Sequence, residues 1–321
     1  MIFWPSLLSV FAVLMLAQPA MAQTFPVKPV RIVVPFGAGG VADLTARTVA
    51  QKLSESLGQP VVIDNKPGAG GVAASDAVAK AEPDGHTLLL MSNGTAVSAG
   101  LFRSLPFDTL RDFAPVSTLG FFDIAIITPA DSRFKSLGDL LVFSKANPGK
   151  LNLGTINIGS TQNLAGELFK ATAGVDVQIV PFNGTPAVIT ALRGGQIDAA
   201  VEILGPVLPQ INAGSLRALA VTGDQRAAVL PSVPTAKESG LPTYVAGSWN
   251  ALAAPAKTPK SVIARLNKDI LAAVNAPDVK KKLAELNVEA RSSSPEQAAE
   301  LLASEVKRWG EVIQRAKIPQ Q

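Results

Sequence analysis

A strand, a glycine-rich loop, a helix and a second strand follow one another twice in this chain of 321 residues, about 120 residues apart. The first unit comprises Val30–Phe36, Gly37–Gly40, a helix to about Leu57 and Val61–Asp64, and the second comprises Leu151–Thr155, Asn157–Ser160, a helix to about Ala173 and Val177–Pro181. A strand, helix and strand in this order wind right-handed against a shared sheet. Two such units therefore predict two similar α/β domains.

Further short runs, at Thr87–Met91, Gln196–Val201 and Leu216–Val221, are nearly continuous in hydrophobic residues. Such runs are typical of parallel strands that are covered on both faces. The extended apolar stretch Phe113–Pro129 is where the chain crosses to the second domain, and Val245–Ala254 is where it returns. We expect domain 1 to contain residues 23–126 and 246–321, and domain 2 to contain residues 127–245.

The last helix has a clear start and a clear buried face. Ser294–Gln297 places a hydroxyl at the N-cap, proline in the first turn and Gln at the capping-box position. Leu302, Val306, Trp309 and Ile313 then form one apolar stripe, which predicts that Trp309 is a core residue.

Composition excludes several kinds of chemistry. The chain has no cysteine, which excludes disulfides, thiolate nucleophiles and Cys-rich zinc sites. Its one histidine, His86, lies in a turn before a strand, which favours a structural role and excludes a multi-histidine metal site. The net charge of +4 comes from residues 257–321, where 12 basic and 8 acidic side chains alternate along helical segments without stacking aromatics. We therefore expect neither a metal nor a nucleic-acid partner.

The amino terminus has the features of an export signal. The apolar run Leu7–Ala17 is followed by Ala20-Met21-Ala22, the pattern of small residues that signal peptidase accepts. The run is short for a membrane span, and no Lys or Arg precedes it. We expect residues 1–22 to be a signal peptide that is cleaved after Ala22, with an uncleaved anchor as the alternative.

The two glycine loops are candidate ligand sites, because open α/β sheets bind ligands beyond the carboxyl ends of their strands. The loops present Gly39 and Gly40 in the first unit and Gly159, Ser160 and Thr161 in the second. Free N–H groups at a helix amino terminus carry about half a positive charge and hold an anion without an arginine. Neither loop contains a basic residue, so we expect an uncharged anion site between the domains.

Five side chains near strand ends are further candidates, and several keep two interpretations. Asp43 lies in a first helical turn, where it either complements the helix dipole or contacts the ligand. Glu202 follows the run at residues 196–201 and either accepts from a ligand hydroxyl or amine or is a solvated or supporting group. Ser92 and Thr95 follow another strand and are candidate donors, while Phe182 is either a pocket wall or a core residue.

The segment Gly37–Ala42 also matches the dinucleotide-binding pattern G-x-G-x-x-A after a strand. Gly68–Ala73 matches the same pattern where a Rossmann fold has no use for it, so the pattern is weak in a chain with 26 glycines. A P-loop and a G-x-S-x-G nucleophile elbow are both missing from the sequence. We expect no cofactor and no enzyme activity, with a secreted or Rossmann-type enzyme as the less favoured alternative.

A specific resemblance rests on segments that recur in order over the chain after residue 22. These segments are Pro29–Gly40, Asp64–Gly71, Pro83–Leu89, Leu164–Phe169, Gly194–Asp198, Leu216–Thr222 and Leu230–Thr235. Their order and spacing resemble the Bug family, the periplasmic solute receptors of tripartite tricarboxylate transporters. The resemblance implies a two-domain periplasmic-binding-protein fold of the type II Venus-flytrap kind, with two crossover strands.

The resemblance also implies how a ligand is held. Backbone amides of Phe36–Asp43, Ala38 included, and of Gly159–Thr161 are expected to bind a ligand carboxylate, partly through waters. Two departures lie in domain 2, which is expected to read the variable part of the ligand. The second helix begins Thr161-Gln162-Asn163 where proline, a small residue and histidine are usual, and Glu202 stands where aspartate is common.

The sequence as a whole predicts a periplasmic, monomeric solute-binding protein. It is expected to capture a small organic anion, a carboxylate, and to deliver it to the membrane components of a tripartite tricarboxylate transporter. A receptor that serves a membrane sensor kinase would bind the same ligand and is the alternative.

Overall fold

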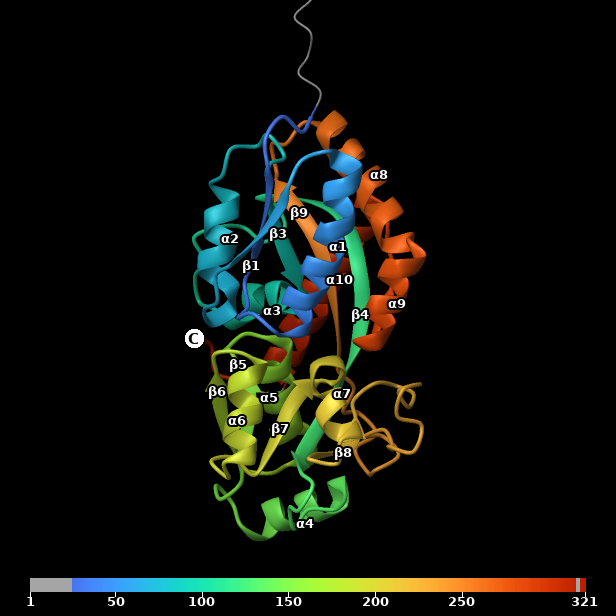
Figure 1. Cartoon of the computed structure of the whole chain (residues 1–321). Helices are drawn as coiled ribbons and strands as arrows, with labels where there is room; N and C mark the ends of the chain where they lie inside the picture. The colour runs from blue at the N-terminus through green and yellow to red at the C-terminus, as the bar shows by residue number, and fades with distance from the viewer. Residues whose placement is uncertain (1–24, 316–317) are drawn as a thin grey trace, which may run out of the picture.

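The computed structural model describes residues 25–315 and 318–321, which form two α/β lobes, one above the other (Figure 1). The strands are β1 Val30–Val34, β2 Val61–Asn65, β3 Thr87–Ser92, β4 Phe113–Pro129, β5 Asn152–Ile156, β6 Gln178–Phe182, β7 Ala199–Ile203, β8 Leu216–Val221, β9 Gly247–Pro255 and β10 Val288–Ala290. In the described residues they form one mixed sheet in the order β2-β1-β3-β9-β4-β7-β5-β6, with β8 and β10 also paired to β4. The α/β class is confirmed, while the expected signal peptide lies outside the described residues.

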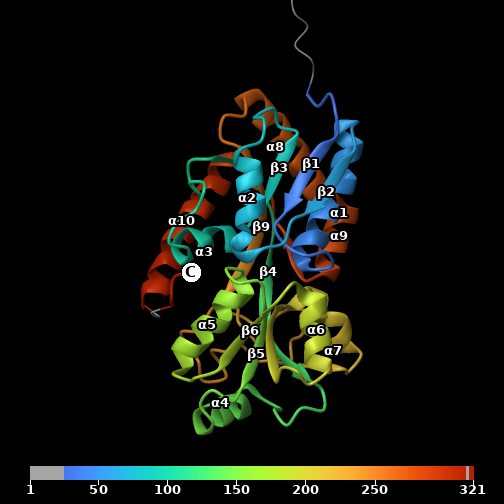
Figure 2. The same cartoon turned by 90° about the vertical axis from the view of Figure 1, so that its left-hand side faces the viewer.

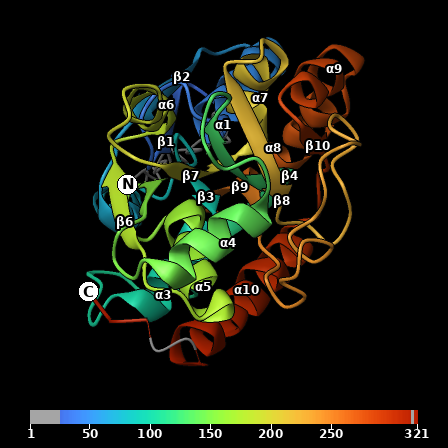
Figure 3. The ribbon, with the colours of Figure 1, turned by 90° about the horizontal axis from the view of Figure 1, so that it is seen from below.

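Helices cover both faces of each half of the sheet. Those of the upper lobe are α1 Val41–Leu57, α2 Val72–Ala79 after the 3-10 turn Ala69–Gly71, α3 Asn93–Leu101, α8 Lys260–Asn275, α9 Pro277–Glu285 and α10 Pro295–Arg315. Those of the lower lobe are α4 Leu137–Ala146, α5 Thr161–Ala173, α6 Thr185–Arg193 and α7 Leu204–Asn212. In the upper lobe α1, α8 and α9 lie on one face and α2, α3 and α10 on the other (Figure 2), and α4 lies across the far end of the lower lobe (Figure 3). Within the described residues, every helix is too short or too polar to cross a bilayer.

The strands β4 and β9 connect the lobes, as the sequence predicts. From Phe113 to Asp123, β4 pairs antiparallel with β9. From Ile124 onward it pairs with β7 and β8 of the lower lobe. The register of β4 shifts twice against β9 and once against β8, so its ladder is bulged on both sides of the point where it changes lobe.

The first and second units adopt the predicted order, and each long helix ends at its glycine. Gly58 and Gly174 cap α1 and α5 in the left-handed conformation, with φ of 65° and 62°. The bounds predicted for this strand, Gln196–Val201, are wrong, because β7 begins at Ala199 and ends at Ile203. Gly195, with φ of 68°, still belongs to the turn after α6, so Glu202 lies inside the strand and does not follow it.

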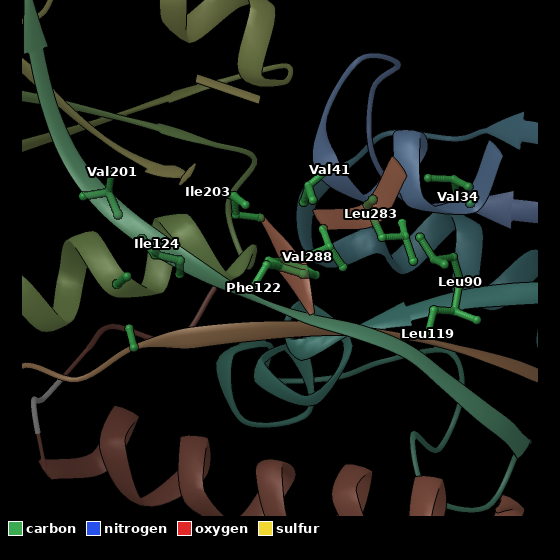
Figure 4. Close-up of a cluster of buried hydrophobic side chains, with 14 of the residues drawn as sticks. Val34, Val41, Leu90, Leu119, Phe122, Ile124, Val201, Ile203, Leu283 and Val288 are labelled. Carbon is green, nitrogen blue, oxygen red and sulfur yellow. The ribbon is translucent and has the colours of Figure 1, made fainter. Parts of the chain in front are cut away.

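The hydrophobic core runs through both lobes without a break at the crossing. Figure 4 shows Leu119, Phe122 and Ile124 along β4, together with Leu90 of the upper lobe and Ile203 of the lower lobe. All five are at most 6% exposed and belong to one cluster. A shared core of this kind holds β4 in place while it pairs with strands of both lobes.

Trp309 is fully buried and confirms the predicted core face of α10. It packs with Leu302 and Ile313 against α3 and β9, and its indole Nε1 donates to Asn93 Oδ1 at 2.6 Å. The lone histidine has the expected structural role, because His86 Nε2 accepts from the Val27 N–H at 3.2 Å.

Replacing Trp309 by Ala should lower the free energy of unfolding by about 3–5 kcal/mol, because it opens a large cavity and removes a donor from Asn93. Urea denaturation followed by circular dichroism measures the change. Val142→Ala on α4, where the residue is 70% exposed, is the control and should shift stability by less than about 0.5 kcal/mol. A loss below about 1 kcal/mol for W309A would contradict the core assignment.

Candidate functional site

A narrow cavity lies between the lobes, against the crossing strands. Its apolar lining comes from both lobes and consists of Phe36, Val41, Ala42, Phe122, Ile156 and Ile203. Its polar lining consists of Ser92, Thr161, Gln162, Thr185, Ser248 and Asn250, and three glycines, Gly37, Gly40 and Gly184, complete it. Among the described residues, the lining contains no Lys, Arg, His, Asp or Glu.

Five helices begin at this cavity, namely α1, α3, α5, α6 and α7. The lining includes their first residues or N-caps, which are Val41, Ser92, Thr161, Thr185 and Ile203. The N-caps of α1, α6 and α7 make no side-chain hydrogen bond to their helices. Unpaired N–H groups and the positive ends of helix dipoles therefore point at the cavity from both lobes. Such a cavity attracts a negative group without a cationic side chain.

Four of the predicted site residues line this cavity: Phe36, Gly40, Ser92 and Thr161. The other eight lie around it and are Ala38, Gly39, Asp43, Thr95, Gly159, Ser160, Phe182 and Glu202. Most of these eight have local roles. Thr95 and Ser92 form the capping box of α3, and Ser160 caps α5 by accepting from the Asn163 N–H at 3.1 Å. Phe182 packs beside Gly154 in the core of the lower lobe.

Asp43 is not part of the cavity lining and organises the first glycine loop. Its carboxylate accepts from the Gly39 N–H at 3.0 Å, from Arg47 Nε at 3.0 Å and from Asn65 Nδ2 at 2.9 Å. Burial of the side chain opposes ionisation, but these hydrogen bonds outweigh it and lower the pKa of Asp43. These contacts fit the capping interpretation of Asp43 and leave its carboxylate no free position toward a ligand.

The lobes touch around the cavity through main chain, and glycines make the contacts possible. The Gly70 N–H donates to the Ile158 carbonyl at 2.6 Å, and a Cβ on Gly159 would lie 2.7 Å from the Gly70 Cα. On another side, a Cβ on Gly37 would lie 2.9 Å from the Asn183 carbonyl oxygen. Each predicted glycine loop thus lines the cavity, but its direct contact is with a different segment of the opposite lobe.

A third contact between the lobes is made by Gly205. Gly205, in the first turn of α7, lies against the carbonyl of Leu286, which follows α9 in the upper lobe. A Cβ at Gly205 would overlap that oxygen. The lobes therefore approach as closely as they do because this position has no side chain.

Glu202 lies directly behind the cavity and is 0% exposed. Thr185 Oγ1, on a residue that lines the cavity, donates to Glu202 Oε2 at 3.1 Å, while Oε1 has no partner among the described residues. Burial raises the pKa of Glu202 to about 7, although hydrogen bonding from Thr185 and the nearby Gln162 side chain opposes the rise. Glu202 thus holds the cavity residue Thr185 from behind.

Besides Gln162, which was noted only as a departure from the family pattern, three polar residues of the lining were missed from the sequence, and two of them carry a readable signal. Ser248 and Asn250 lie on β9, at alternate positions of an otherwise apolar strand, so both face the cavity. Ser248 Oγ lies 3.0 Å from Thr161 Oγ1 of the lower lobe. Thr185 is the third, and its position depends on the α6 contact with Glu202, which local sequence does not reveal.

The buried carboxyl of Glu202 should make stability depend on pH. The fold keeps Glu202 protonated up to about pH 7, whereas the unfolded chain releases that proton near pH 4.5, so stability falls as pH rises between these values. The ionisation should cost up to about 3 kcal/mol by pH 8. Urea denaturation from pH 5 to 8 should show a shallower fall for E202Q than for wild type. Glu285→Gln on exposed α9 is the control, and equal slopes for wild type and E202Q would contradict the assignment.

The family model described as "Tripartite tricarboxylate transporter family receptor" matches residues 45–318. The chain belongs to this family. Its members are periplasmic solute-binding receptors and not enzymes, so the match of Gly37–Ala42 to a dinucleotide pattern is fortuitous. Protein BugT of Bordetella pertussis is 37% identical over 300 residues, which cover 93% of this chain and 92% of BugT.

Several solved structures show the same fold. The periplasmic binding protein BugD has a TM-score of 0.89 at 31% identity, covering 92% of this chain and 100% of that one. MatC from Rhodopseudomonas palustris with bound malate has a TM-score of 0.86 at 33% identity, with 90% and 100% covered. A second R. palustris protein, solved with adipate, has a TM-score of 0.88 at 33% identity, with 92% and 99% covered. The expected two-domain periplasmic-binding-protein fold is confirmed.

Proposed function

We propose that this receptor captures a small organic carboxylate between its lobes and presents it to the membrane components of a tripartite tricarboxylate transporter. One observation carries the proposal: five helix N-termini converge on a cavity whose lining, in the described part of the chain, has no charged side chain. Aligned amide groups stabilise a carboxylate, and the apolar lining accommodates its hydrocarbon part. The malate and adipate of two similar receptors support this ligand class.

We propose further that the ligand carboxylate is held by Gly40 and Val41 of the upper lobe and by Thr161 and Gln162 of the lower lobe. These residues line the cavity at the starts of α1 and α5. Phe36 and Ser92 complete this set from the upper lobe. Ala38, Gly39, Gly159 and Ser160 would act indirectly, by shaping the two loops.

The proposal includes the domain boundaries and the mature form. Domain 1 would comprise residues 23–126 and 246–321, and domain 2 residues 127–245, which is supported by the change of β4 pairing between Asp123 and Ile124. The mature protein would be a periplasmic monomer cleaved after Ala22. Ligand uptake by a strain that lacks this protein separates transport from sensing. Uptake should fall if the protein serves a transporter, whereas loss of a sensor receptor would leave uptake unchanged.

Binding itself is tested by isothermal titration of the purified protein with malate, adipate, succinate and butyrate. We expect at least one of these carboxylates to bind, and its uncharged amide or ester analogue to bind at least about tenfold more weakly, because a neutral group gains less from the helix N-termini. Native mass spectrometry of freshly purified protein should show a co-purified small acid. Equal affinity for the carboxylate and its neutral analogue would contradict the proposed site.

Closure is tested by Gly205→Ala. The added methyl group overlaps the Leu286 carbonyl only when the lobes are together, so the variant should fold normally but bind its carboxylate at least about tenfold more weakly. Gly138→Ala, in the first turn of α4 in the same lobe, is the matched control, since a Cβ there meets only Ser136 Oγ at 3.5 Å. Wild-type affinity in G205A would show that the observed contact has no part in binding.

A further inference from the structure

Asn250 occupies the wall of the cavity that the crossing strands form. On β9 it is opposite Ser92 of β3 and Gly120 of β4, so it lies in the middle of the sheet. Side chains alternate along a strand, and Asn250 and Ser248 therefore face the cavity while Trp249 and Ala251 face α10. The neighbour of Asn250 on β4, Gly120, has no side chain that could hydrogen-bond the Asn250 amide.

The side chain of Asn250 is 0% exposed, and both Nδ2 and Oδ1 lack a hydrogen-bond partner in the described part of the chain. Another buried asparagine provides a comparison. Asn93 is also 0% exposed, but its Nδ2 donates to the Gly247 carbonyl at 3.2 Å and its Oδ1 accepts from Trp309 at 2.6 Å. An unpaired buried amide destabilises a fold, so a side chain with two unpaired atoms in a binding cavity indicates a partner that arrives with the ligand.

The amide of Asn250 restricts the chemistry of that partner. Nδ2 needs an acceptor and Oδ1 needs a donor, and a carboxylate offers acceptors only. A second ligand carboxylate would bring its negative oxygens against Oδ1, in a lining without cationic side chains. A carboxamide supplies both a donor and an acceptor, and a hydroxyl group does so on one atom.

We propose that Asn250 is a specificity-determining residue and that the ligand is a small monocarboxylate whose second polar group is a carboxamide or a hydroxyl. The inference rests on the proposed function, since it assumes that a carboxylate is held by the helix N-termini. Asn250 then binds the uncharged end, while the apolar side chains of Phe36 and Phe122 contact the carbon chain between the two polar groups.

Four probes of equal chain length test the proposal by isothermal titration: butyrate, 4-hydroxybutyrate, succinate and succinamate. For wild type, succinamate or 4-hydroxybutyrate should bind at least about tenfold more tightly than both succinate and butyrate. In Asn250→Leu this preference should fall below about threefold, with the affinity for butyrate within about threefold of wild type. Asn275→Leu on exposed α8 is the control and should keep the wild-type ranking.

A second variant covers the case in which N250L does not fold. Asn250→Asp has the same shape but presents only acceptors when ionised, so it should retain 4-hydroxybutyrate, which can donate, better than succinamate, whose carbonyl it would repel. A wild-type preference for succinate over both neutral probes would overturn the inference, as would an unchanged ranking in both variants. If no carboxylate binds wild type at all, the proposed function fails, whereas binding with a ranking independent of Asn250 refutes only this inference.

Discussion

The proposed function places one electrostatic requirement on the two halves of the sheet: an anion must be stabilised by backbone dipoles alone. Five helices begin around one cavity, and none of the described residues that line it is charged. A single helix end offers a weak field, but several that converge in a site from which water is excluded reinforce one another. Convergence requires strands of both lobes to end at the same place, which the repeated strand, loop and helix units provide.

Main-chain contacts around the cavity follow from the same requirement. The N-termini reach one ligand only if the lobes approach within contact distance, and side chains would hold them apart. Gly37, Gly70, Gly159 and Gly205 remove that obstacle at positions widely separated in sequence. Their roles differ from that of a flexible hinge residue, because here the missing side chain allows close approach between two surfaces.

Local sequence predicted the elements well, and long-range contacts account for what it missed. The extent of β4 and the glycine ends of α1 and α5 follow from hydrophobic runs and capping chemistry, which are properties of neighbouring residues. The bounds of β7 do not follow from neighbouring residues, because the turn after α6 continues to Gly195 and the strand begins only at Ala199. Asn250 stands out only when its neighbours across the sheet are known, although its polar character within an apolar strand was visible.

The shared strands also determine the route of a ligand. One wall of the cavity is formed by Phe122 on β4 and by Ser248 and Asn250 on β9. This wall is part of the sheet that runs through both lobes. The lobes cannot separate on that side without breaking the hydrogen bonds between β4 and β9, so any opening is a rotation of one lobe about these strands. In the proposed function, a solute would therefore enter and leave on the side opposite these strands, and a membrane partner that receives it would contact the protein at that edge.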